Sequence, residues 1–120
     1  MPTKRIPDGL GAAALAAAVA GATDRDTVGT AVRWSLQRLA EAAPGGAVEV
    51  RVPPFGAVQA VEGPRHTRGT PPNVVETDAA TWLALATGAL TWDAALGAGR
   101  VSASGARADL AAVLPVDLAG

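Results

Sequence analysis

The fold of this chain is decided by residues 82–105, which read WLALATGALTWDAALGAGRVSASG. Apolar side chains recur there at helical spacing after Asp78, a residue type that N-caps helices, and Gly88 stands where a left-handed residue would end the helix. Thr91 can cap a second short helix, which Gly99 would end. This stretch therefore predicts two short helices in succession.

A strand is predicted directly after these helices. Residues 100–104 alternate polar and apolar side chains, and Gly105 then interrupts the pattern. Because glycine adopts positive φ angles without a steric penalty, we expect positive φ at Gly88, Gly99 and Gly105. The order of elements in this region is thus helix, helix, strand.

The spacing of these three glycines is the most specific pattern in the sequence. Ten residues separate Gly88 from Gly99, five separate Gly99 from Gly105, and the predicted cap Asp78 precedes them. Over residues 78–114 this arrangement resembles the C-terminal signature of sterol carrier protein type 2 domains, while the first half of the chain matches only in the order of its elements. The resemblance implies an α+β fold and non-enzymatic carriage of a lipid or another apolar small ligand.

In the domains that this chain resembles, short helices and a sheet enclose a lipid-binding tunnel. The alanines of residues 84–111 would leave room between the elements, although an ordinary packed core uses the same apolar side chains, so the composition leaves both alternatives open. The apolar residues that the resemblance implies as lining or bordering the site are Leu83, Leu85, Leu90, Trp92, Leu96, Leu110 and Leu114.

Length, charge and composition limit the classes of function. The chain has 120 residues, enough for a single domain over 1–120, in which we expect residues 1–7 and 116–120 to be frayed. Its 10 Lys and Arg against 11 Asp and Glu give a net charge of −1, which argues against nucleic-acid binding. With no cysteine and one histidine, thiolate and histidine-rich metal sites are not expected. The abundance of alanine, glycine, proline and arginine is typical of GC-rich, actinobacterial-type genomes.

The N-terminal region has some features of a targeting segment. Lys4 and Arg5 precede the apolar run 10–22, as the charged region of a signal peptide would. The run is mostly alanine, however, and Asp8 and Gly21 suit a helix cap and a helix stop, so we predict a helix. No stretch reaches the apolar length of a membrane span, and the sequence predicts a soluble, cytoplasmic protein.

A longer helix is predicted for residues 27–43, after a cap at Asp24 or Asp26. Trp34 falls off its apolar stripe, so that it either packs against the first helix or is a partly exposed aromatic that could meet a partner. The apolar stripe, which would pack on a sheet, consists of Val28, Val32, Leu36, Leu39 and Ala43.

Three further strands and a last helix complete the predicted fold. Residues 47–52 alternate valines with charged side chains, and extended segments are expected at 55–61 and 73–77. A last helix around Leu110 and Leu114 would stop at a proline. This order of elements predicts an α+β domain, with a sterol-carrier-like mixed sheet of about four to five strands and helices layered on one face.

The loop 63–72 is the densest group of polar donors in the sequence. Arginine side chains suit phosphate or carboxylate groups, but a solvated loop would have the same composition, so both readings stand. As a general base, His66 lacks a partner nearby in the sequence. The candidate anion-binding residues are Arg65, His66, Thr67, Arg68 and Thr70.

Three hypotheses for function follow. The first is non-enzymatic binding of a lipid or apolar small molecule, which requires no catalytic residue, metal or cofactor. The second is a protein-interaction or regulatory module, with a closed core and a protein partner or a second copy meeting the polar loop and Trp34. The third and weakest is an enzyme that acts on an anionic substrate at His66.

Overall fold

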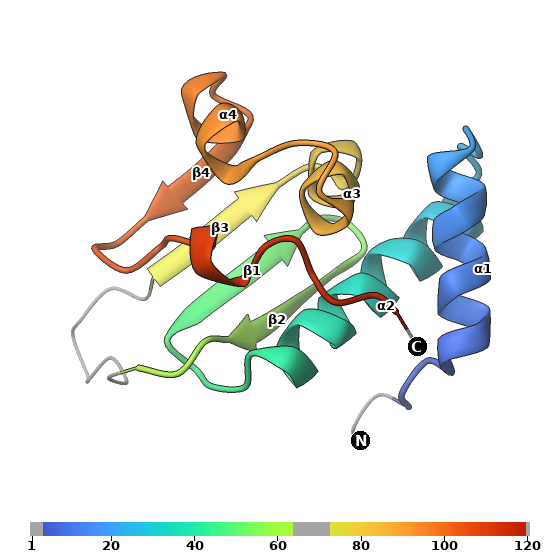
Figure 1. Cartoon of the computed structure of the whole chain (residues 1–120), viewed down its shortest axis with the longest axis horizontal. Helices are drawn as coiled ribbons and strands as arrows, with labels where there is room; N and C mark the ends of the chain where they lie inside the picture. Colours follow the sequence, from blue (N-terminus) through green and yellow to red (C-terminus); the bar gives the residue numbers. More distant parts are fainter. Residues whose placement is uncertain (1–3, 64–72, 120) are drawn as a thin grey trace.

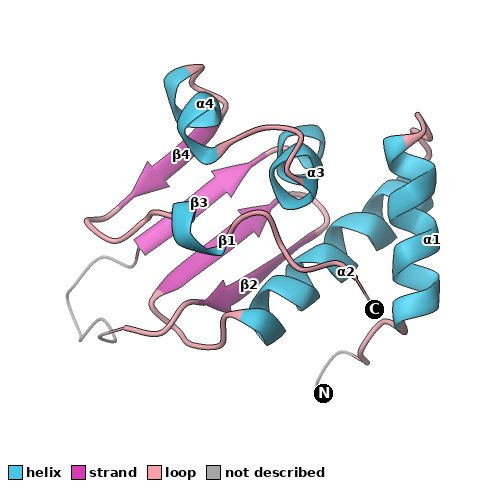
Figure 2. Ribbon diagram, in the orientation of Figure 1, coloured by secondary structure: helices cyan, strands magenta, loops and turns pink. Residues whose placement is uncertain are grey.

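The computed structural model describes residues 4–63 and 73–119, and these form a four-stranded sheet covered on one face by helices (Figures 1 and 2). None of its helices is long and apolar enough to cross a membrane within these described ranges. In chain order the elements are α1 (Asp8–Val19), α2 (Arg25–Ala42), β1 (Val48–Val52), β2 (Gly56–Ala60), β3 (Asn73–Thr77), α3 (Ala79–Thr87), α4 (Trp92–Gly97), β4 (Val101–Ser104) and the 3₁₀ turn η1 (Ala111–Val113).

The sheet is mixed, as the sequence predicts. Its strand order is β2-β1-β3-β4. β1 runs antiparallel to β2 and parallel to β3, and β3 runs antiparallel to β4. The chain therefore forms a hairpin from β1 and β2 and then crosses over to place β3 on the other side of β1.

The alternation of side chains in β1 separates a covered face of the sheet from an open one. Val48, Val50 and Val52 are buried, whereas Glu49 and Arg51 point to the other face, where their side chains form an ion pair of 2.7 Å. On the covered face, Val50 lies opposite Val58 of β2 and Val75 of β3. The helices pack on this apolar face, which holds the core.

Two helices, α2 and α3, supply most of the core above the sheet. Asp24 caps α2 by accepting a hydrogen bond from the backbone N–H of Thr27 at 3.0 Å. The predicted stripe is correct, since Val32, Leu36 and Leu39 are buried in the core. From α3, Trp82 and Leu85 enter the same core.

The first helix, α1, packs against α2 at a distance from the sheet (Figure 1). Trp34 is fully buried in this contact, and its Nε1–H donates to Oδ1 of Asp8 over 3.1 Å. Gly11 is the buried residue of α1, and any Cβ there would overlap the Trp34 ring. The alternative of an exposed Trp34 is therefore wrong: the side chain lies off the sheet-facing stripe because it forms the interface with α1.

Both chain ends of the described part, for which we expected fraying, make specific contacts. The backbone N–H and carbonyl of Ile6 form reciprocal hydrogen bonds with the Gln37 side chain, each of 2.9 Å. Arg38 donates from Nε and Nη2 to the carbonyl oxygen of Asp117, and the N–H of Val116 donates to the carbonyl of Ala86 at 3.0 Å. Both ends are thereby held against α2 and α3.

The last predicted helix is wrong in its extent, because the structure has only the three-residue turn η1. Asp109 accepts a hydrogen bond from the N–H of Ala111 over 2.8 Å and so starts the turn, and Pro115 follows soon after and cannot continue a helix. Too few residues lie between them to complete a helical nucleus. The segment therefore continues extended along α3.

Candidate functional site

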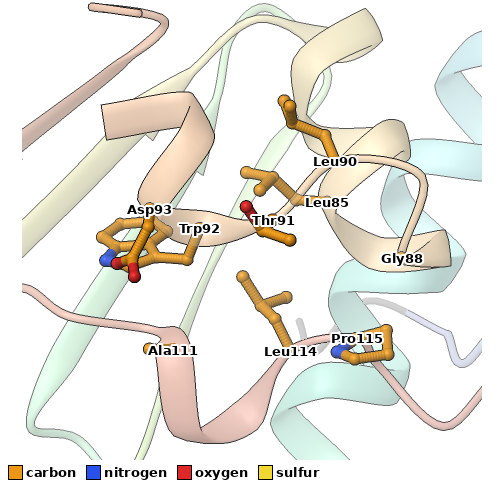
Figure 3. A pocket seen from close by; sticks show the side chains of 9 residues that line it. All are labelled: Leu85, Gly88, Leu90, Thr91, Trp92, Asp93, Ala111, Leu114 and Pro115. Atoms are coloured by element: carbon orange, nitrogen blue, oxygen red, sulfur yellow. The ribbon is translucent and has the colours of Figure 1, made fainter. Parts of the chain in front are cut away.

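A pocket of about 260 Å³ lies where the corner between α3 and α4 meets the C-terminal segment (Figure 3). Three parts of the chain build it: the end of α3, the link into α4, and the segment around η1. Its lining residues are Leu85, Gly88, Leu90, Thr91, Trp92, Asp93, Ala111, Leu114 and Pro115.

The corner between α3 and α4 follows from its caps and its glycine. Oδ1 of Asp78 accepts a hydrogen bond from the N–H of Thr81 at 2.7 Å, which fixes the start of α3. Gly88 ends that helix with a φ of 84°, a conformation that other residues adopt at a cost. The hydroxyl of Thr91 then accepts from the N–H of Ala94 at 3.1 Å and starts α4. The two helices thus turn sharply and place Leu90 and Trp92 at the pocket.

The C-terminal segment closes the other side of the pocket. Pro115 lies against Gly88, where an added Cβ would come within 3.4 Å of the proline ring. The hydrogen bond from Val116 to the carbonyl of Ala86 fixes this segment on α3. In Figure 3, Leu114 points into the space between Leu85 and Trp92. This wall comes from residues far from the corner in sequence, so only the folded chain contains the site.

The structure brings together four of the seven apolar residues that the resemblance implied: Leu85, Leu90, Trp92 and Leu114 line the pocket. The other three lie elsewhere. Leu110 is fully buried in the core, Leu83 packs partly buried against the core, and Leu96 is 41% exposed on α4.

Five lining residues were not among the predicted site residues. The sequence indicates Gly88 and Thr91 only as helix-ending and helix-capping residues. Asp93 falls in the first turn of the predicted second helix, where acidic residues are favoured without any role in a pocket. Ala111 is one of the alanines expected to leave room between the elements, and Pro115 was expected only as the stop of the last helix. The path of the C-terminal segment brings both to the pocket.

The pocket is apolar with one acidic group. Among the described residues, Asp93 is the only charged residue that lines it, and no described Lys or Arg does. Its volume lies just below the usual range for sites that take drug-sized ligands, roughly 300–1,000 Å³, and above the roughly 150 Å³ of an engineered apolar cavity that accepts benzene. It therefore suits a short alkyl chain or one small ring.

The clearest pKa shifts lie at the contact between α1 and α2, away from the pocket. The hydrogen bond from Trp34, followed by that from Arg5, lowers the pKa of the Asp8 carboxyl below its usual value. The hydrogen bond from Arg5 likewise lowers the pKa of Glu41. These groups form an ion-pair cluster that fastens the N-terminal segment to α2.

Two other expectations concern metal ions and anions. Within residues 4–63 and 73–119 no group of three or more His, Cys, Asp and Glu side chains could hold a metal ion. The candidate anion-binding residues Arg65, His66, Thr67, Arg68 and Thr70 lie outside the described residues.

Comparison with known proteins bears on residues 24–116, which match the family model described as "Bacterial SCP ortholog". The match begins at the cap of α2 and ends just after the pocket-lining segment, so it includes the whole sheet and every residue that lines the pocket. α1 lies before it. No curated protein matches the chain.

Proposed function

Because this chain belongs to the bacterial SCP ortholog family, we propose that it binds a small apolar ligand in the pocket between α3, α4 and the C-terminal segment, and carries it without chemical change. The proposal requires no catalytic residue and no cofactor. The resemblance to sterol carrier domains implies a carrier role, and the proposal assigns that role to one pocket of this fold.

The observation that carries this proposal is the pocket itself, a space beside the core that the surrounding side chains leave unfilled. Leu85 and Trp92 belong to the core, yet Leu90, Leu114 and Pro115 stand around open space beside them. Apolar groups that border a void lose the dispersion contacts they would make in a filled core. An apolar ligand would restore those contacts and remove apolar surface from water.

A protein-interaction role is the second candidate, and one observation favours it. Leu10 and Val19 on α1 are 64% and 66% exposed, and α1 lies outside the residues that match the family. Trp34, which this hypothesis offered to a partner together with the polar loop, is fully buried and cannot serve in this role. The exposed apolar side chains of α1 are therefore the surface that this second candidate would use.

A titration with 1-octanol, followed by NMR, tests ligand binding directly. Octanol is neutral, and its chain is of a size suited to the pocket. We expect the indole N–H resonance of Trp92 to shift in a saturable way, because Trp92 lines the pocket. Trp34 and Trp82 serve as internal controls, since both are fully buried and their Nε1–H groups are bonded to Asp8 and Ser35. An unchanged Trp92 resonance up to the solubility limit of octanol would contradict the proposal.

A further inference from the structure

The pocket has one acidic residue in its described lining, Asp93. Asp93 lies on the first turn of α4 and is exposed to solvent. Figure 3 places Asp93 and Trp92 at one side of the pocket, with Gly88 and Pro115 at the opposite side. Among the ion pairs of the described residues, none involves Asp93. Its charge is therefore available to a ligand.

The backbone around the pocket adds little charge of its own. At the C-terminal end of α3, the carbonyls of Ala84, Leu85 and Ala86 accept hydrogen bonds from the N–H groups of Leu90, Gly88 and Val116. At the N-terminal end of α4, the Thr91 hydroxyl accepts a hydrogen bond from the N–H of Ala94. Among the described residues that line the pocket, the Asp93 carboxylate is therefore the charged group that a ligand meets.

From this distribution of charge we infer that the ligand is an amphiphile whose polar end is a hydrogen-bond donor, a protonated amine or a hydroxyl group, and that Asp93 selects it. The inference rests on the proposed function, because it concerns the ligand of the same pocket. The apolar part of the ligand lies among Leu85, Leu90 and Leu114, and its polar end lies toward Asp93. A ligand that ends in a carboxylate brings two like charges together and binds more weakly.

Three probes with the same eight-carbon chain separate the effects of chain and polar end. At neutral pH octylamine is cationic, 1-octanol is neutral and octanoate is anionic. We expect affinities in the order octylamine, octanol, octanoate, measured from the Trp92 indole and Gly88 amide shifts. Because Asp93 is exposed, we expect octylamine to bind up to about fivefold more tightly than octanoate, which is the upper end of the range for a surface ion pair.

Substitution of Asp93 identifies it as the selecting group. Asp93→Asn keeps the shape of the side chain and should reduce the affinity for octylamine to that for octanol, whose hydroxyl can still donate to the amide oxygen. Glu76→Gln is the matched control, since it removes the same charge from the open face of the sheet, where Glu76 of β3 lies opposite Arg51 and Ser102. Glu76→Gln should leave the order of the three affinities as it is. Melting temperatures without ligand verify that both variants fold.

The outcomes distinguish this inference from the proposed function. If octanoate binds as tightly as octylamine, or if Asp93→Asn leaves the preference unchanged, the inference is overturned while ligand binding in the pocket stands. If none of the three probes shifts Trp92, ligand binding fails and the inference fails with it.

Discussion

The indole of Trp82 donates a hydrogen bond from Nε1 to the hydroxyl oxygen of Ser35 over 2.8 Å, with both side chains fully buried. The Ser35 hydroxyl in turn donates to the carbonyl of Ala31, one turn earlier in α2, over 2.7 Å. This buried polar contact joins α2 to α3. Because α3 also carries Leu85, the position of one pocket wall depends on it.

Ser35→Ala would leave the Trp82 N–H buried without a partner. We expect the free energy of unfolding to fall by about 1–3 kcal/mol, the usual cost of a buried unsatisfied donor. Urea denaturation measures this change. The control is Ser104→Ala on β4, where the hydroxyl is exposed and its removal should stay within about 0.5 kcal/mol. Equal stability of the two variants would show that the Trp82–Ser35 contact does not stabilise the core.

Gly11 and Gly9 provide a matched pair of substitutions on α1. A Cβ at Gly11 would overlap the Trp34 ring, whereas a Cβ at Gly9 meets nothing within 4 Å. We expect Gly11→Ala to destabilise the protein by about 1–3 kcal/mol through overpacking, and Gly9→Ala to be neutral or to stabilise it by up to about 1 kcal/mol through its better helix propensity. Thermal or urea unfolding measures both, and a stable Gly11→Ala variant would contradict the packing of α1 on α2.

The contact between α1 and α2 should weaken in acid. The pKa of Asp8 is lowered in the folded state, chiefly by the Trp34 hydrogen bond, from an ordinary value of 3.8. A lowered carboxyl pKa contributes stability that is present above the unfolded-state pKa and is lost as the pH falls through the folded-state pKa. We therefore expect the free energy of unfolding to decrease below about pH 4, and Asp8→Asn to make this decrease smaller.

Measurements of unfolding at pH 7 and pH 3 on the wild type and on Asp8→Asn check this prediction. Asp93→Asn serves as the control, since Asp93 forms no ion pair within the described residues. The same pH dependence in wild type and Asp8→Asn would contradict a role for Asp8.

The helices and strands could be predicted because the features that determine their ends lie within a few residues of them in the sequence. Gly88, Gly99 and Gly105 have φ angles of 84°, 69° and 99°, as their positions at the ends of elements predicted. Asp78 and Thr91 cap α3 and α4 through hydrogen bonds that span only three residues. The mixed sheet with helices on one face also agrees with the prediction, because strand alternation and helix periodicity specify which faces are apolar.

Features that depend on contacts between distant residues could not be predicted in this way. Trp34 is buried because Gly11 leaves room for its ring, and nothing in the sequence shows that these two residues are in contact. The pocket is a second example, since Ala111 and Pro115 reach it only through the path of the C-terminal segment over α3. The sequence could identify apolar residues as candidates for the site. It could not predict that Leu85 and Leu114 line the same pocket or that Leu96 is exposed, because both follow from the packing of the helices.

The most direct test of ligand binding in the pocket compares Ala111→Trp with Ala112→Trp. Both alanines are exposed and adjacent in η1, but only Ala111 lines the pocket, so a bulky ring at 111 should fill the space that a ligand would occupy. At ten times its Kd, 1-octanol should stabilise the wild type and Ala112→Trp by about 1.4 kcal/mol, seen as a higher melting temperature and a shifted Trp92 indole resonance. Ala111→Trp should fold and show neither effect. Octanol binding to Ala111→Trp with the affinity of the wild type would contradict the assignment of this pocket as the ligand site.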